Sequence, residues 1–172
     1  AGVIKPGQSV VLAQNPDAVV DVVRAACASQ GATLIPAWED SHVDAVVEHG
    51  RTRVTMTTMA GRYESVVLGL RGRHQIQNAV TAVRLLETLR ARHGIAVTPD
   101  AVLTGLEDVE WPARLEWRAF GQGHVLIDGA HNPAGAAALA AYVRDTFGRA
   151  VPFVVGAMAD KNIEAMAAAL AP

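Results

Sequence analysis

The chain has 172 residues, enough for one ordinary domain or for parts of two. Its hydrophobic fraction of 51% supports a packed core, and its net charge of −2 gives no general attraction to nucleic acid or to an anionic membrane. The single cysteine, Cys27, excludes an internal disulfide, and no apolar run reaches the roughly 18 residues of a membrane span. The opening residues lack the pattern of a signal peptide. We therefore expect a cytoplasmic protein with neither nucleic-acid nor membrane partners.

The first part of the chain carries a strand–helix–strand pattern. Residues 9–14 (SVVLAQ) predict a buried strand, and residues 32–37 (ATLIPA) predict a second, short one. The helix between them is predicted to have Asn15 as its N-cap, Pro16 at its first position and Gly31 past its end. Such tight connections predict a βαβ unit with parallel strands.

The residue pattern changes twice in the middle of the chain, first to one typical of β-strands and then to one typical of helices. Residues 51–58 and 62–70 are rich in β-branched residues and predict a hairpin. From His74 to Gly94 the apolar period is helical, and a second helix is predicted from Thr98-Pro99 onward. The first of these two helices is expected to present one apolar face, made of Ile76, Val80, Val83, Leu86 and Leu89.

A new series of elements begins near residue 115. HVLID predicts a strand, residues 133–147 a helix stopped by Gly148, and residues 151–158 (VPFVVGAM) another strand. Asn162 is predicted to cap a last helix. Because two strands do not make an independent doubly wound sheet, the chain is expected to be truncated or to need a partner.

The sequence DGAHNP, residues 128–133, follows the strand HVLID directly. Functional groups of open parallel sheets gather at the C-terminal ends of strands, which is where this pattern places Asp128 and His131. Gly129 allows a tight turn, and the free N–H groups of the next helix suit an anion or a polar ligand. In the alternative interpretation, Asp128 only binds loop amides and Asn132 is an ordinary helix cap.

Arg114 lies in WPARLE, fourteen positions before Asp128. This segment follows the two predicted helices and comes just before the new series of elements. The planar fork of a guanidinium at such a hinge can clamp a phosphate. The alternative for Arg114 is a surface ion pair with Glu116 or Glu110.

Four segments, GRHQIQNAVTAV, WPARLE, LIDGAHNP and MADKN, occur in this order. With them the chain resembles the folylpolyglutamate synthase/dihydrofolate synthase family of the Mur ligase superfamily, over nearly its whole length. One departure is Ala113, where the family generally has Gly. The resemblance implies an α/β fold in which residues 1–112 are the end of a Mur-ligase-type central ATPase domain. Residues 113–172 would then be the first half of a Rossmann-like C-terminal glutamate ligase domain.

Members of this family are ATP-dependent amide ligases. The resemblance implies that ATP phosphorylates a carboxylate of a folate or pteroate substrate and that L-glutamate then attacks the acyl phosphate. It implies ATP and Mg²⁺ as cofactors, with the missing N-terminal region of the same protein as a partner. The magnesium ligands and a carbamylated lysine of the family would precede Ala1.

By similarity, Asn78 would bind adenine, Arg114 the ATP phosphates and Asp128 the ribose. His131 would lie near the reacting groups, and Lys161 would approach the glutamate carboxylate or the phosphates. The alternatives are that Asn78 is a solvated helix residue and that Lys161 is a solvated loop charge. His74 is a weaker candidate, and four further histidines are expected at the surface: His42, His49, His93 and His124.

A phosphate-binding G-x-x-x-x-G-K-[ST] loop does not occur in this sequence, because Lys5 is followed by Pro6 and Lys161 by Asn162. The sequence shows no metal-binding spacing either. We therefore expect that the chain by itself neither hydrolyses ATP nor ligates glutamate.

Two other functions stay open from the sequence. One is a Mur-type ligase for a peptidoglycan or cyanophycin-like acceptor, and the other is a non-catalytic nucleotide-binding module. Within the folate family, the sequence does not separate dihydrofolate synthase from folylpolyglutamate synthase activity.

Overall fold

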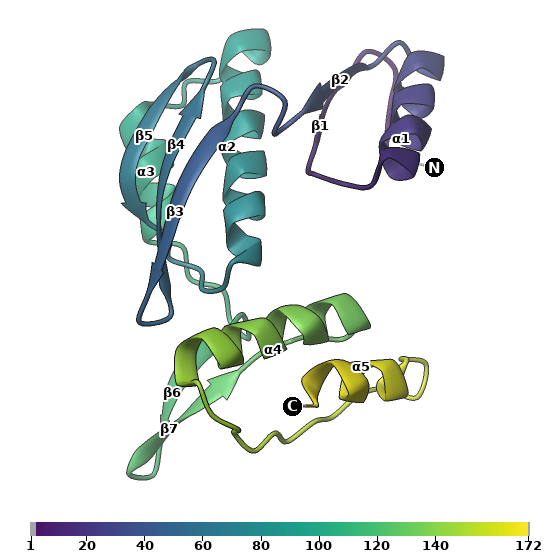
Figure 1. Ribbon diagram of the computed structural model, residues 1–172. Helices are drawn as coiled ribbons and strands as arrows, with labels where there is room; N and C mark the ends of the chain where they lie inside the picture. The colour runs from purple at the N-terminus through teal and green to yellow at the C-terminus, as the bar shows by residue number, and fades with distance from the viewer. Residues whose placement is uncertain (1–2, 172) are drawn as a thin grey trace.

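The computed structural model describes residues 3–171, whose helices and strands form three consecutive groups (Figure 1). The first group contains β1 (Ser9–Leu12), α1 (Asp17–Ser29) and β2 (Thr33–Pro36). The second contains β3 (His42–Glu48), β4 (Arg51–Thr58), β5 (Gly61–Val67), α2 (His74–His93) and α3 (Pro99–Glu107). The third contains β6 (Glu116–Phe120), β7 (Gly123–Ile127), α4 (Pro133–Phe147) and α5 (Ile163–Leu170).

The first group is the predicted βαβ unit, with β1 and β2 parallel. The predicted cap of its helix is wrong. The helix begins at Asp17, Pro16 occupies the N-cap position, and the Asn15 amide donates to the carbonyl of Ala13 at 2.9 Å. The reason is that the Pro16 carbonyl closes the first turn, accepting from the N–H groups of Val19 and Val20.

The second group contains a three-stranded antiparallel sheet in the order β3–β4–β5. The hairpin of β4 and β5 was predicted and is confirmed. Strand β3 was not predicted, although HVDAVVE alternates polar and apolar residues in part. It pairs along its full length with β4, from His42 opposite Thr57 to Glu48 opposite Arg51.

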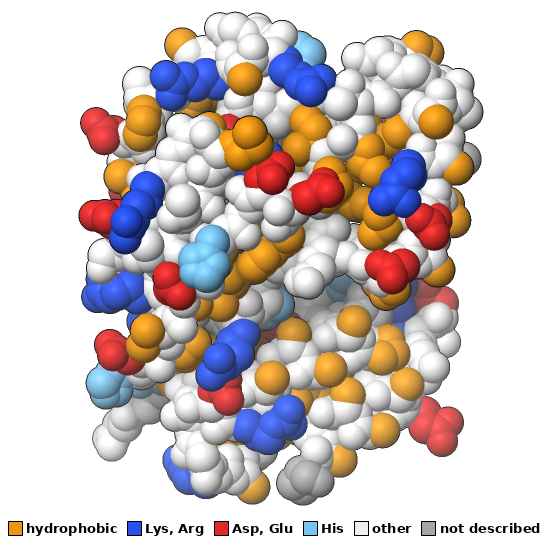
Figure 2. All heavy atoms as spheres, turned by 45° about the horizontal axis from the view of Figure 1, so that its top comes forward, with side chains coloured by type: hydrophobic (Ala, Val, Ile, Leu, Met, Phe, Trp, Pro, Cys, Tyr) orange, Lys and Arg blue, Asp and Glu red, His pale blue; other side chains and the backbone are white. Residues whose placement is uncertain are grey.

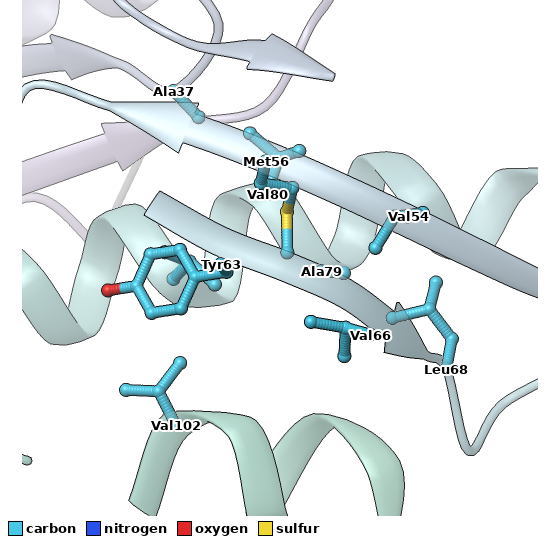
Figure 3. Packing of buried hydrophobic residues seen from close by; sticks show 10 residues of the cluster. Ala37, Val54, Met56, Tyr63, Val66, Leu68, Ala79, Val80 and Val102 are labelled. Atoms are coloured by element: carbon cyan, nitrogen blue, oxygen red, sulfur yellow. The ribbon is translucent and has the colours of Figure 1, made fainter. Parts of the chain in front are cut away.

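Helix α2 packs against this sheet and forms the main core with it, as Figure 3 shows for the buried side chains. The predicted apolar face is confirmed, because Val80 and Val83 are fully buried and Ile76 and Leu86 pack against the core. Both predicted ends are also confirmed. Gly94 ends α2 in the left-handed conformation, and the Thr98 hydroxyl caps α3 by accepting from Ala101 N at 3.1 Å.

A polar cluster closes one edge of this core. The Glu87 carboxylate accepts from the Tyr63 hydroxyl at 3.0 Å, from the Thr58 hydroxyl at 2.6 Å and from the Arg84 guanidinium at 3.0 Å. Burial, together with the charge and hydrogen bond of Glu87, raises the pKa of Tyr63 to about 12.

The raised pKa predicts a loss of stability in alkali. Tyr63 of the unfolded chain ionises near pH 10, whereas the folded protein holds the proton to about pH 12. The contribution is fully present below pH 10 and is lost as pH rises toward 12. Urea unfolding across this interval should therefore show a shallower fall of the unfolding free energy for Tyr63→Phe than for the wild type. Equal slopes in the two proteins would contradict the assignment.

The third group lies beneath the second in Figure 1 and differs from the sequence prediction in two ways. Strand β7 and helices α4 and α5 form as predicted, with Asn132 and Asn162 as side-chain caps. Strand β6 was not predicted and pairs antiparallel with β7. The strand predicted at 151–158 is wrong, because these residues form no strand and the Val154 side chain is fully exposed. An apolar run becomes a strand only when another strand pairs with its backbone.

Close contacts join the second and third groups. A side chain at Gly50, in the β3–β4 turn, would place its Cβ 2.8 Å from the Tyr142 hydroxyl of α4, and the φ of 71° at Gly50 favours glycine. An ion pair of 2.7 Å joins Arg73 to Asp145. On the described part of the face drawn in Figure 2, acidic and basic side chains are interspersed and no extended basic patch forms. No helix among residues 3–171 is long and apolar enough to cross a membrane.

Candidate functional site

The loop that follows β7 is tied to the segment that precedes β6. Asp128 accepts from Leu115 N through one oxygen, at 3.0 Å, and from Ala130 N through the other, at 2.8 Å. Gly129 N donates to the carbonyl of Ala113 at 2.8 Å. Asp128 therefore binds loop amides, as the alternative interpretation of the sequence predicted. It leaves lone pairs of both carboxylate oxygens available, since each oxygen accepts one of these bonds.

Arg114 lies over this loop. A Cβ built on Gly129 would be 3.3 Å from the carbonyl oxygen of Ala113 and 3.6 Å from a terminal nitrogen of Arg114. The Arg114 guanidinium thus lies beside Gly129, at ordinary van der Waals distance from the place of a Cβ. Arg114 and Asp128, fourteen positions apart in the sequence, are brought together at the hinge, which is the segment of residues 108–115 between α3 and β6.

The alternative for Arg114, a surface ion pair with Glu116 or Glu110, does not form among residues 3–171. Glu116 instead pairs with Arg118 and accepts from Ala113 N at 2.9 Å, and these contacts lower the pKa of Glu116, the backbone hydrogen bond most. Within residues 3–171, no carboxylate lies within 4.0 Å of the Arg114 guanidinium. Its charge is therefore free to meet an anionic ligand.

The backbone around Arg114 is strained. Ala113 has φ 56° and Leu115 has φ 48°, both in the left-handed region that favours glycine. Leu115 is only 2% exposed, so burial of its side chain helps to hold this conformation. The departure at Ala113 noted in the sequence thus falls on a residue whose backbone geometry favours glycine.

The rest of the loop leads into α4. His131 is exposed, and its Nδ1 lies 3.0 Å from the carbonyl of Gly129, which leaves Nε2 free. The Asn132 side chain accepts from Gly135 N at 2.8 Å, and Pro133 is the first helical residue. Asn132 is thus the predicted N-cap of this helix.

His74, a weaker candidate from sequence, lies at the same junction. A Cβ at Gly72 would be 2.8 Å from the His74 ring and 2.8 Å from the Leu115 side chain. Burial lowers the pKa of His74, the Asp128 carboxylate opposes this shift, and the charge of Arg114 adds to it. No local sequence pattern indicated that His74 would lie near Arg114 and Asp128, which are 40 and 54 positions further along the chain.

Two predicted site residues lie outside this cluster. Asn78 follows one turn later on α2, is exposed, and donates to the Gln75 side chain at 2.8 Å. Lys161 pairs with the adjacent Asp160 at 3.0 Å, and no hydrogen bond or ion pair joins it to the loop after β7 in the described residues. The four remaining histidines are exposed, as predicted.

A cleft of about 520 Å³ runs along the hinge between the second and third groups. Its charged lining consists of Arg71, Arg114 and Arg118 together with the carboxylates of Glu110 and Glu116, and Trp111 and Trp117 also line it. The cleft provides room beside Arg114 for a ligand with anionic groups.

Removing the Asp128 carboxylate is expected to loosen the hinge. Asp128→Ala leaves the N–H groups of Leu115 and Ala130 without their acceptor, which costs about 2 kcal/mol of unfolding free energy. Asp145→Ala is the matched control, because it removes one carboxylate from an exposed ion pair and costs about 1 kcal/mol or less. Urea unfolding measures both. Equal losses in the two variants would show that Asp128 does not hold the hinge.

Comparison with known proteins now adds to this geometry. The family model described as Mur ligase, glutamate ligase domain, matches residues 113–172. The folylpolyglutamate synthase of Lacticaseibacillus casei is 33% identical over 97% of this chain and 39% of its own length. The dihydrofolate synthetase of Saccharomyces cerevisiae is 30% identical over 95% of this chain and 39% of its own length.

A solved complex of folylpolyglutamate synthase with AMPPCP and folate matches 96% of this chain with a TM-score of 0.87 and 30% identity. The chain belongs to the folylpolyglutamate synthase/dihydrofolate synthase family. It covers 40% of that solved chain, so it spans about two fifths of the relatives that it matches.

Membership in the folylpolyglutamate synthase/dihydrofolate synthase family confirms the α/β fold class predicted from the sequence. The family model begins at residue 113, next to Arg114 and in the strained segment described above.

Proposed function

We propose that this chain is part of an ATP-dependent ligase that adds L-glutamate to folate or dihydropteroate. One observation carries the proposal. The Arg114 guanidinium has no carboxylate partner among residues 3–171, lies over the loop of Asp128 and lines a cleft at the hinge. The names of the relatives, folylpolyglutamate synthase and dihydrofolate synthetase, support the choice of acceptor.

In this proposal, residues 1–112 are the end of a central ATPase domain and residues 113–172 begin the glutamate ligase domain. The nucleotide binds at the junction. Asn78 contacts adenine and Arg114 contacts the phosphates. Asp128 binds the ribose through the lone pairs that its hydrogen bonds from Leu115 N and Ala130 N leave available.

The reaction has two steps. A carboxylate oxygen of the folate or pteroate attacks the γ-phosphorus of ATP, ADP leaves, and an acyl phosphate forms. The amino group of glutamate then attacks the acyl carbon, phosphate leaves with the electron pair of the broken C–O bond, and the amine proton passes to a base. Arg114 offsets charge on the transferring phosphoryl group, which is the largest contribution expected of a protein in such a reaction.

His131 and Lys161 are the proposed catalytic residues. The free Nε2 of His131 can take the amine proton, and its Nδ1 contact with Gly129 fixes the ring. Lys161 would bind the glutamate carboxylate or the phosphates, for which it exchanges its contact with Asp160.

Mg²⁺ would offset further charge on the phosphates. No three His, Cys, Asp or Glu side chains within residues 3–171 are grouped to hold a metal ion. From the resemblance to the family, we propose that the ligands of Mg²⁺ lie outside this chain, and the two steps above are assigned without it. We also propose a cytoplasmic location.

The test uses the full-length protein with ATP, magnesium, glutamate and either dihydropteroate or a reduced folate. Product from dihydropteroate alone identifies dihydrofolate synthesis, and extension of the folate identifies polyglutamylation. The 172-residue chain alone is expected to turn over no ATP. A muramyl peptide that reacts when neither folate acceptor does would overturn the proposal, and ATP binding without any ligation would indicate a non-catalytic module.

A further inference from the structure

A short chain of side-chain hydrogen bonds runs along the first turns of α2. Gln75 lies at its centre and is 6% exposed. Its Nε2 is 3.0 Å from Nε2 of His74, and its Oε1 accepts from the Asn78 amide at 2.8 Å. The two ends of one buried carboxamide thus contact two different side chains.

The His74 ring stands at one end of this series of hydrogen bonds. Because Gln75 presents an amide nitrogen, the ring accepts at Nε2 and carries its proton on Nδ1. Gly72 allows the ring to lie this close to the backbone, because a Cβ there would be 2.8 Å from the ring. The lowered pKa of His74 favours the neutral form that this arrangement requires. With its amide nitrogen toward the ring, Gln75 turns its oxygen toward Asn78.

The orientation of Gln75 fixes that of Asn78 in turn. One N–H of Asn78 is used by Gln75, so Oδ1 and the second N–H remain for a ligand. Adenine offers a donor at N6 beside an acceptor at N7, the pair that an Asn side chain binds through two hydrogen bonds. A base with oxygen at position 6 would set an acceptor against Oδ1.

We propose that Gln75 is a positioning residue that orients the Asn78 amide and thereby makes the nucleotide site select a 6-amino purine over a 6-oxo purine. This inference rests on the proposed function, in which Asn78 contacts adenine. Gln75 does not touch the nucleotide and acts only through Asn78. A merely structural role would lower stability without changing the choice of base.

The experiment compares the binding of ATP and inosine triphosphate to the full-length protein by calorimetry. Inosine triphosphate carries oxygen in place of the 6-amino group, so the ratio of the two dissociation constants isolates that position. Gln75→Met keeps the side-chain length and removes both hydrogen bonds. It is expected to reduce the preference for ATP roughly tenfold, the lower end of the discrimination by one such pair.

Gln75→Glu is the matched control, because its carboxylate still accepts from Asn78. The ATP preference should stay near that of the wild type. His74→Phe keeps a ring against Gly72, removes the acceptor for Gln75, and should reduce the preference even if Gln75→Met does not fold. Wild-type preference in either folded variant, or an equal loss in Gln75→Glu and Gln75→Met, overturns the proposal.

Asn78→Ala separates this inference from the proposed function. If ATP binding is unchanged in Asn78→Ala, the adenine contact itself is wrong and the role of Gln75 falls with it. If Asn78→Ala weakens ATP binding while Gln75→Met keeps the wild-type preference, only the positioning role is wrong.

Discussion

Arg114→Ala in the full-length protein is expected to lower kcat for ATP-dependent ligation by roughly 100-fold to 1000-fold, the usual effect of removing one group that stabilises developing charge. Its guanidinium has no carboxylate partner in the described chain, so its removal breaks no ion pair there. Thermal unfolding of the variant should therefore match that of the wild type. Single-turnover rates at saturating ATP measure the effect on the chemical step.

Two further variants sharpen this test. Arg118→Ala removes a guanidinium from the same cleft, but one that already pairs with Glu116, and should keep near wild-type turnover. Arg114→Lys should be intermediate, because an ammonium keeps the charge and loses the planar fork. Unchanged turnover in Arg114→Ala would remove this residue from the site, and with it the main support for the proposed function.

Glu87→Ala is expected to cost about 3–5 kcal/mol of unfolding free energy, the range for breaking one side of a buried ion pair. The Glu87 side chain is 8% exposed and that of Arg84 is 11% exposed, so the remaining cation has little access to water. Arg84 Nε already lacks a partner among the described residues. The variant would also leave the hydroxyls of Tyr63 and Thr58 without their acceptor.

Glu64→Ala provides the control for Glu87→Ala. Its partner, Arg62, is 63% exposed and Glu64 itself is 67% exposed, so the loss should be about 1 kcal/mol or less. Replacing both Arg84 and Glu87 by Met should recover part of the stability, since no buried charge is then left alone. A loss below about 1 kcal/mol in Glu87→Ala would show that water reaches the cluster.

The helices were predictable because their signals are local. The apolar face of α2, the left-handed end at Gly94 and the caps Thr98, Asn132 and Asn162 each depend on residues within a few positions. The predicted N-cap of α1 was wrong by one residue, because Pro16 closes the first turn with its carbonyl. Such boundaries depend on backbone geometry that composition does not fix.

The strands were less predictable because a strand depends on its neighbour. Strands β3 and β6 were not predicted. In the structure β3 pairs with β4, and β6 pairs with β7. Residues 151–158 have the composition of a strand and yet form none. Their backbone has no strand beside it in the described part of the chain.

The sequence by itself determined the family, the helices and the candidates Arg114 and Asp128, because these depend on motifs and on periods within short segments. Only the tertiary structure decided that Arg114 has no ionic partner within residues 3–171 and that Asp128 accepts from two loop amides. It also decided that His74 lies near Arg114 and Asp128. The physical reason is distance along the chain. Contacts between residues dozens of positions apart form when separate elements pack, and no local pattern encodes which side chains will then meet.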